Sequence, residues 1–480
     1  MNAPAVIMEQ FGRLVGEANT IPFADDRARV QSAILGDWAY ETAPTAVVLP
    51  ADTAQVQAVV TMAGTLGVGI SVIPNAAGNG ISVTSGNRAS IVLDLRRMDR
   101  ILEFNSDSGY ALLEPGVSFD QLRAFIESEG GGYWIDTDTN GANSVSGSVT
   151  ERAFGYTPYG DHLLMQCGME VVTANAELTR TGMGALPGSD TWQLFKYNFG
   201  PYLDGLFSRS DFAIVTKLGL WLMPEPPAFH PFMVTLPGTA ALEAAVEVLR
   251  PLKIGMIVPN TVVISHASAD AELLGAAGDP RGADFARDRG GDAWTLFGAL
   301  YGIPDNVALT WEMLKEALST IPSGAIFTTA DAPEHPPWPL RTQLMRGLAA
   351  YSAPASGSDS RLWFVASAPM DGTAASEMQR ILTDTLVPGD ISYSYEFALT
   401  WRTMFMRVTV PYTNGDFTAR REACLKLIER LAASGFATSH DCPELTGAVS
   451  RAQTGASLRK LQTALGQALD PQGVFGSREG

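Results

Sequence analysis

The sequence predicts an α+β protein of more than one domain, and three observations support this fold class. Its 480 residues exceed what one domain of ordinary size needs, so two or three domains are expected. Short apolar, β-branched runs alternate with segments of helical periodicity, which indicates strands and helices in mixed order. The proline-rich segment at residues 222–231 interrupts this pattern and predicts a domain boundary.

The chain is expected to open with an irregular arm that contains one helix, at residues 1–43. A strand–helix–strand unit follows, with its strands at 44–50 and 69–74. Asp52 and Gln55 match a capping box at the start of the helix. The residues that share the apolar face of this helix are Val56, Val59, Val60 and Ala63.

Further strands are predicted at residues 89–95 and 109–117. Ser118 and Gln121 then predict a capped helix that Gly130 ends. The region that follows, 141–226, is a series of short strands. Its apolar runs at 165–175 and 177–182 are broken by Asn and Gly, as in hairpins.

The opening of that region, GANSVSGSV at 141–149, has almost no bulky side chains. Small residues allow another molecule to approach the backbone, and free N–H groups suit a phosphate-bearing or planar ligand. A glycine- and serine-rich surface loop is the alternative that composition leaves open.

The second half of the chain is predicted to mix helices and strands. Helical segments are expected at 240–252, 306–321 and 417–435, and strands at 256–265 and 364–369. No internal repeat or coiled-coil heptad is evident.

Composition excludes several classes of protein. Apolar residues make up 46% of the chain and charged residues 18%, which is typical of a soluble globular protein. A net charge of −18 argues against nucleic acid and would suit a basic partner protein, although solubility also explains it. No signal peptide and no apolar run of about 20 residues is visible, so a cytoplasmic protein without membrane contact is expected. The five histidines and three cysteines show no metal-ligand spacing, so no metal site is expected.

Several long motifs carry a resemblance to a known family. They are GYTPYGDH (155–162), MQCGMEVV (165–172), RTGMGALPGSDTWQLFKYNFGP (180–201), DGLFSRSDFAIVTK (204–217) and WLMPEPP (221–227). The chain resembles the family of vanillyl-alcohol oxidase and p-cresol methylhydroxylase, from about Pro44 to Pro471. The resemblance implies a two-domain flavoprotein with a split FAD-binding domain at 1–226 and 437–480. A substrate cap domain with an antiparallel sheet would occupy 227–436.

The same resemblance implies the residues that hold FAD. A loop at 74–80 would bind the pyrophosphate through backbone N–H groups. It departs from the family pattern because it contains neither arginine nor tyrosine. The implied cofactor residues are Pro74, Asn75, Ala76, Ala77, Gly78, Asn79, Gly80, Thr139, Ser144, Gly147, Ile214, Val215 and Thr216.

The family's chemistry is hydride transfer from a carbon para to a phenol. Two tyrosines and an arginine hold the phenolate oxygen in relatives, but the matching positions here read Asn79-Gly80 and Ser439-His440. His440 could bind an oxyanion if protonated or act as a base if neutral; a structural loop histidine is the alternative. The family's His-His pair is replaced by Phe405-Met406, which makes the predicted pocket more apolar.

Four other residues are implied to line the pocket. Tyr156 should lie near the flavin, or else only pack in the core. Glu396 is the candidate base, because Thr139 stands near a position where some relatives have an aspartate; a solvated carboxylate is the alternative. Arg341 could offset charge on the reduced flavin or hold a substrate anion, unless it is a surface residue. Arg361 is a further candidate.

Oxidases of this family link flavin covalently to a histidine at the position of Arg361, which cannot form that bond. Tyr351 is the one alternative attachment point, so FAD is expected to be bound non-covalently.

The resulting hypothesis is an FAD-dependent oxidoreductase that takes hydride from a benzylic or allylic carbon of a small aromatic, phenol-like molecule. One alternative is an oxidase or dehydrogenase of a non-phenolic or anionic alcohol, with His440 and Arg361 binding the anion. A non-catalytic electron-transfer subunit is the other. Oxygen or a cytochrome would accept the electrons, and a homodimer is expected from the resemblance.

Overall fold

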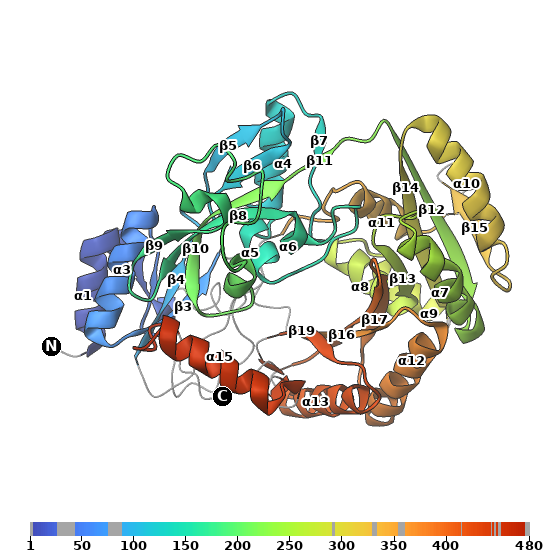
Figure 1. The fold of residues 1–480 in the computed structure, drawn as a ribbon. Helices are drawn as coiled ribbons and strands as arrows, with labels where there is room; N and C mark the ends of the chain where they lie inside the picture. Colours follow the sequence, from blue (N-terminus) through green and yellow to red (C-terminus); the bar gives the residue numbers. More distant parts are fainter. Residues whose placement is uncertain are drawn as a thin grey trace.

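The computed structural model describes residues 3–25, 44–74, 89–289, 293–328, 334–353, 361–413, 415–442, 444–445, 448–449 and 453–475. These residues form two units that lie side by side, and the chain passes from the first to the second between β11 (Met223–Pro224) and β12 (Ala228–Pro237) (Figure 1). The α+β fold class is confirmed by the mixture of helices and separate sheets.

The first unit contains a four-stranded sheet in the order β1-β2-β4-β3. Its last three strands are parallel, and β1 pairs antiparallel with β2. The predicted capping box is present, since the Asp52 side chain accepts a hydrogen bond from Gln55 N at 2.8 Å. The elements are α1 (Ala3–Val15), η1 (Glu17–Asn19), β1 (Thr20–Pro22), β2 (Ala46–Val48), α3 (Thr53–Leu66), β3 (Gly69–Ile73) and β4 (Ser90–Asp94).

The N-terminal helix α1 is more than an irregular arm, because Ile7, Phe11 and Val15 enter the same apolar core as the buried face of α3. The C-terminal residues Val474 and Phe475 join this core too. The middle of the predicted arm, residues 26–43, lies outside the described residues.

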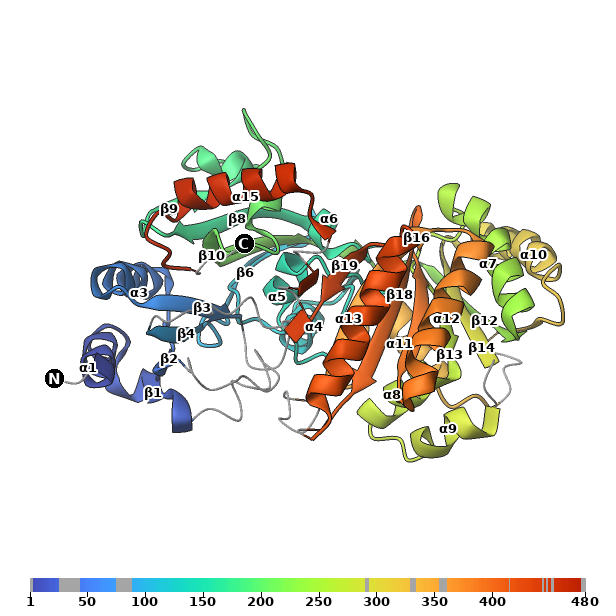
Figure 2. The same ribbon diagram turned by 90° about the horizontal axis from the view of Figure 1, so that it is seen from below.

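A five-stranded antiparallel sheet in the order β5-β6-β10-β8-β9 completes the first unit. Helix α15 lies over this sheet (Figure 2), and its Leu465 and Leu469 pack against the sheet's core. The elements are β5 (Ile101–Asn105), β6 (Tyr110–Leu113), α4 (Phe119–Ser128), α5 (Val145–Thr150), α6 (His162–Met165), β8 (Gln166–Thr173), β9 (Leu178–Arg180), η3 (Gly182–Ala185), η4 (Asp204–Phe207), β10 (Ala213–Trp221) and α15 (Ala456–Leu469). A short pair, β7 (Tyr133–Trp134) with β11 (Met223–Pro224), stands apart from it.

The second unit is built on an eight-stranded sheet in the order β15-β12-β14-β13-β17-β18-β16-β19. All pairings between its described strands are antiparallel. The strands are β12 (Ala228–Pro237), β13 (Val262–His266), β14 (Ala293–Gly302), β15 (Ala325–Thr328), β16 (Arg361–Pro369), β17 (Ser394–Leu399), β18 (Thr403–Pro411) and β19 (Thr438–Asp441). Since β19 pairs in this sheet, the chain stays in the second unit beyond the expected boundary at residue 437. The exact domain division stays a prediction.

Helices cover both faces of the large sheet. The larger core lies under α7 (Thr239–Ile254), α10 (Pro304–Leu318), α12 (Gly372–Leu386) and α13 (Phe417–Ala433), and Figure 2 shows α12 and α13 across that face. The opposite face carries α8 (Ala267–Ala276), α9 (Gly282–Arg289) and α11 (Trp338–Met345). The 3₁₀ turn η5 (Val387–Gly389) follows α12.

Strand β18 shows how the sequence separates the two faces. Its even-numbered residues, Met404, Met406, Val408 and Val410, are buried in the larger core. Its odd-numbered residues from Thr403 to Thr409 are half-buried on the opposite face. That opposite face is the one that meets the first unit.

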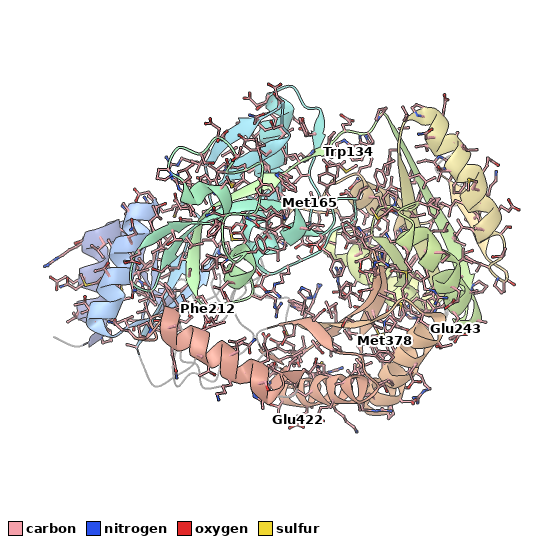
Figure 3. The ribbon with its side chains drawn as sticks, in the orientation of Figure 1. Trp134, Met165, Phe212, Glu243, Met378 and Glu422 are labelled. Atoms are coloured by element: carbon pink, nitrogen blue, oxygen red, sulfur yellow. The ribbon has the colours of Figure 1, made fainter. Side chains whose placement is uncertain are left out.

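Side chains from both units pack at the junction (Figure 3). Trp134, labelled there, contacts Phe229 of the second unit at a ring distance of 5.7 Å and Tyr301 at 6.4 Å. No helix within the described ranges is long and apolar enough to cross a membrane.

Candidate active site

The strand register places two of the predicted pocket residues, Glu396 and His440, in one row across the large sheet. Ser265 of β13 lies opposite Glu396 of β17, and Glu396 opposite Arg407 of β18. Arg407 is opposite Val365 of β16, and Val365 opposite His440 of β19. Directly opposed residues point their side chains to the same face of a sheet. The row therefore brings Glu396 and His440 onto the face that meets the first unit.

Arg341 reaches this row from helix α11. Its Nη2 donates to Ser265 Oγ, Asp270 Oδ1 and Glu396 Oε2, each at 2.8 Å. Its Nε also donates to Asp270 Oδ1, at 3.1 Å. Arg341 is thus a buried cation between two carboxylates, which excludes the alternative of a surface arginine.

Arg407 continues the network toward the first unit. Its Nη1 donates to Glu396 Oε1 at 3.0 Å and to the Tyr156 hydroxyl at 3.3 Å. The guanidinium also lies 5.3 Å from the ring centre of Phe154, which stacks on Phe405 at 5.1 Å. Since Tyr156 and Phe154 belong to the first unit, Arg407 connects the two units at the site.

These contacts set the charge of each group. Burial opposes ionisation of Glu396, but the facing Arg341 and Arg407 outweigh it and lower the pKa of this carboxyl. Burial raises the pKa of Asp270 despite its bond to Arg341. Burial likewise raises the pKa of the Tyr156 hydroxyl, which stays protonated and can donate to a ligand oxygen. A carboxylate with a lowered pKa and both oxygens paired is a weak proton acceptor, so the geometry favours a positioning role for Glu396.

The loop that carries Tyr156 is held by Asp136. The backbone N–H groups of Tyr156 and Thr157 donate to this buried carboxylate. His162 Nε2 bonds to it at 3.0 Å, and His162 Nδ1 bonds to Ser148 Oγ at 2.8 Å. A Cβ at Gly155 would lie 1.4 Å from Asp136 Oδ1, so only glycine fits there. Asp136 therefore fixes the position of Tyr156.

His440 has a different environment from that of an oxyanion-binding cation. Its Nε2 lies 2.9 Å from the Arg152 carbonyl oxygen and its Nδ1 lies 2.9 Å from Ser439 Oγ. Burial, with Arg209 nearby, lowers the pKa of His440 to about 4. The imidazole is therefore neutral at ordinary pH, with its Nε2–H donating to the carbonyl.

Arg361 and Tyr351 lie away from the row. Arg361, at the start of β16, forms an ion pair with Glu272 at 2.7 Å. Tyr351 forms an isolated bridge with Asn140, and its backbone N–H donates to the Thr139 carbonyl. Burial raises the pKa of the Tyr351 hydroxyl. Thr139 and Tyr351 are thus brought together, whereas Arg361 is engaged elsewhere.

A cavity that opens to solvent lies in the first unit, and its lining residues are candidates to hold part of FAD. Three predicted cofactor residues, Pro74, Ile214 and Val215, line it. Ser144 and Gly147 form the start of α5, and Ser146 and Thr150 of this helix also line the cavity. A Cβ at Gly147 would lie 3.1 Å from the Pro74 ring, so glycine at this position allows α5 to pack closely against Pro74. The lining combines apolar side chains with polar ones, such as Ser146, Thr150 and Ser210, which fits a cofactor that has both an apolar ring and polar groups.

Thr216 points away from this cavity, because its buried hydroxyl bonds to the Glu170 carbonyl at 3.2 Å. Asn75, Ala76, Ala77, Gly78, Asn79 and Gly80, the predicted phosphate loop, lie outside the described residues.

Comparison with known proteins identifies the family. Residues 44–182 match the FAD binding domain family. The flavoprotein subunit of 4-cresol dehydrogenase [hydroxylating] from Pseudomonas putida is 31% identical, and the alignment covers 98% of this chain and 94% of the relative. The chain belongs to the p-cresol methylhydroxylase family.

Solved structures of this family agree with the fold. p-Cresol methylhydroxylase with substrate bound superposes with a TM-score of 0.89 at 30% identity, over 99% of this chain and 96% of that chain. For 4-ethylphenol oxidase from Gulosibacter chungangensis the TM-score is 0.88 at 25% identity, over 98% and 96%. The predicted two-domain flavoprotein fold and FAD as cofactor are confirmed, and the protein is an FAD-dependent oxidoreductase.

Three residues of the site are not predicted from the sequence: Arg407, Asp270 and Asp136. Arg407 could have been noticed as the one charged residue of its strand, on the face that Phe405 shares. Asp270 and Asp136 gave no comparable signal, because their partners lie 71 and 20 residues away in the chain.

Proposed function

We propose that this p-cresol methylhydroxylase relative oxidises a benzylic or allylic carbon of a small aromatic, phenol-like molecule. FAD, when bound, accepts the hydride. The observation that carries the proposal is the Tyr156–Arg407–Glu396–Arg341 network at the junction of the two units. Relatives with the same fold are named for 4-cresol and 4-ethylphenol, which supports a phenolic substrate.

In this proposal the protein binds and orients the substrate. The Tyr156 hydroxyl and the Arg407 guanidinium donate hydrogen bonds to a substrate oxygen, which stabilises negative charge on it. Phe154 and Phe405 form an aromatic wall beside them. Glu396 and Arg341 hold Arg407 in place. His440 and Arg361 lie at the edge of the site with partners of their own.

The alternative of an anionic or non-phenolic substrate has one observation in its favour. The 1'-carboxy-chondrochloren decarboxylase of Chondromyces crocatus is 32% identical over 57% of this chain and 53% of that relative, and its name describes a carboxylated substrate. Relatives named as D-2-hydroxyglutarate dehydrogenase and glycolate oxidase subunit GlcD cover less than half of the chain.

Anaerobic mixing of the FAD-loaded protein with p-cresol and vanillyl alcohol tests the proposal. We expect the flavin absorbance to bleach with at least one of these donors. Tyr156→Phe should slow bleaching by roughly 10- to 100-fold, because one donor to the developing charge is lost. If no aromatic donor reduces the flavin while a cytochrome still exchanges electrons with it, the electron-transfer subunit is the better assignment. Adding oxygen or cytochrome afterwards identifies the acceptor.

We also propose that FAD is bound non-covalently, since Arg361 cannot form the family's histidyl link. Acid precipitation of the purified protein should leave yellow colour in the supernatant. Colour in the pellet would contradict this and point to Tyr351, and Tyr351→Phe would then release the flavin.

A homodimer is the proposed assembly, and one surface suits it. Seven large apolar side chains between β9 and β10, the aromatic patch, are exposed: Leu186, Leu194, Phe195, Tyr197, Phe199, Tyr202 and Leu203. Phe199 is fully exposed, and Phe195, Tyr197 and Tyr202 are 54%, 53% and 41% exposed. At roughly 200 Å² per aromatic side chain these four expose about 500 Å². The leucines bring the total toward the ~800 Å² that each partner of a stable complex covers.

Charge favours a second copy as the occupant of this patch. Segment 186–203 contains two charged residues, Asp190 and Lys196, and Lys196 is buried. Two copies of a chain with a net charge of −18 can meet here with little like-charge repulsion, whereas a basic partner would select an acidic surface.

Sedimentation of the holoenzyme tests this assembly. We expect a dimer for the wild type and a monomer for Phe199→Asp, because a carboxylate would be buried in the apolar interface. Leu309→Asp is the matched control, since Leu309 is an exposed leucine (67%) on α10 outside the aromatic patch. A monomeric wild type, or a dimer that survives Phe199→Asp, would rule out the patch as the interface.

A further inference from the structure

We infer that Arg407 is the binding residue for a carboxylate carried by the aromatic substrate. The protein would then select aromatic acids over neutral aromatic molecules of the same shape. This inference rests on the proposed function, since it names the substrate class of that site.

The first support is the unused edge of the Arg407 guanidinium. Both side-chain hydrogen bonds of Arg407 to described residues come from Nη1, which donates to Glu396 and to Tyr156. Within the described ranges, Nε and Nη2 donate to no residue, and the side chain is 30% exposed. The Nε–Nη2 edge presents two parallel N–H groups, which match the two oxygens of a planar carboxylate.

The second support is that the neighbouring basic groups are engaged. Arg341 is held by Asp270 and Glu396, and Arg361 by Glu272. Arg209 pairs with Glu151 at 3.2 Å and Asp441 at 3.0 Å. Arg152 donates to Ser208 and to backbone carbonyls, and His440 is neutral. The anion-binding role that the sequence suggested for His440 and Arg361 fits Arg407 better.

Pairing with Glu396 does not prevent Arg407 from binding a second carboxylate. In this same site Arg341 binds the side chains of Asp270 and Glu396 together, each at 2.8 Å. One guanidinium in this site therefore contacts two acidic side chains at once, Asp270 through Nε and Nη2 and Glu396 through Nη2. Tyr156 adds a donor beside Arg407, and the Phe154–Phe405 stack supplies an apolar surface for the ring of an aromatic acid.

Binding of three probes to the oxidised, FAD-loaded protein tests the inference. They are 4-methylbenzoate, its neutral isostere 4-methylbenzamide, and p-cresol, each followed by the perturbation of flavin absorbance. We expect 4-methylbenzoate to bind at least tenfold more tightly than the amide. Arg407→Gln should weaken binding of the benzoate about 10- to 100-fold and binding of the amide by several-fold less, because the amide loses a hydrogen bond but no charge pairing. Arg407→Lys should recover part of the loss, because it restores the charge without the two-pronged geometry.

Arg402→Gln is the matched control. Arg402 is exposed at the turn between β17 and β18, so the variant removes the same charge from the same hairpin. It should bind all three probes like the wild type. The flavin content of each variant verifies that the cofactor site is intact.

Two results would overturn the inference. Equal affinity for benzoate and amide in the wild type would show that the site does not recognise the charge. An effect of Arg407→Gln on p-cresol alone would restrict Arg407 to the substrate oxygen that the proposed function gives it, with no role in binding a carboxylate. Neither result depends on turnover. If aromatic donors reduce the flavin but the benzoate binds no more tightly than the amide, the inference fails and the proposed function stands. If the benzoate binds more tightly but no aromatic donor reduces the flavin, only the proposed function fails.

Discussion

Replacing Arg341 by methionine should lower the free energy of unfolding by about 3–5 kcal/mol, because the change leaves the buried Asp270 without its cation and Glu396 with Arg407 alone. Arg341 is 3% exposed and lies between Asp270 and Glu396. Methionine fills much of the same volume, so the loss would come from charge and hydrogen bonds and not from a cavity. The shift of the urea midpoint of the FAD-loaded protein measures it.

A surface arginine provides the control for this prediction. Arg123 is 42% exposed and pairs with Glu127 four residues later on α4. Arg123→Met should cost less than about 1 kcal/mol, as exposed pairs usually do. Adding Asp270→Asn and Glu396→Gln to Arg341→Met should recover part of the loss, since the stranded charges are then removed. Equal midpoints for Arg341→Met and Arg123→Met would show that the buried network contributes little.

Glu396→Gln should slow flavin reduction by an aromatic donor roughly 10- to 100-fold while FAD content stays unchanged. The amide cannot hold two guanidinium groups as the carboxylate does, so Arg407 would lose its fixed position beside Tyr156. Stopped-flow absorbance under anaerobic conditions measures the rate. Glu422→Gln, on the outward side of α13 (Figure 3), is the matched control and should have no effect.

The pH profile of Glu396→Gln separates a positioning role from that of a base. The pKa of Glu396 is lowered in the folded protein, so the carboxylate is ionised throughout the neutral range. The contribution of the ionised Glu396 to the free energy of unfolding is fully present above the usual pKa of a carboxyl group. It is lost as the pH falls through the lowered pKa. Between about pH 6 and 8, the pH dependence of the flavin reduction rate should therefore have the same shape in the wild type and in Glu396→Gln. A pKa that is seen in the wild-type profile and is missing from that of Glu396→Gln would instead identify Glu396 as the base.

The sequence by itself determined the local elements and the family. Asp52 and Ser118 cap their helices as predicted, since a cap depends on residues three positions apart. The buried faces of α3 and β18 follow from the spacing of apolar residues. The long motifs between residues 155 and 227 identified an FAD-dependent oxidoreductase of the p-cresol methylhydroxylase family, which the comparisons confirmed.

Only the tertiary structure decided which side chains meet at the site. Glu396 and His440 lie on one face of the sheet because β17, β18, β16 and β19 are neighbours in that order. The spacing of apolar residues predicts which residues of one strand share a face, but it does not predict which strands pair. The network from Asp270 through Arg341, Glu396 and Arg407 to Tyr156 joins residues up to 251 positions apart. The low pKa of His440 and the open edge of Arg407 likewise depend on burial and partners. Those are properties of the packed sheet and not of the local sequence.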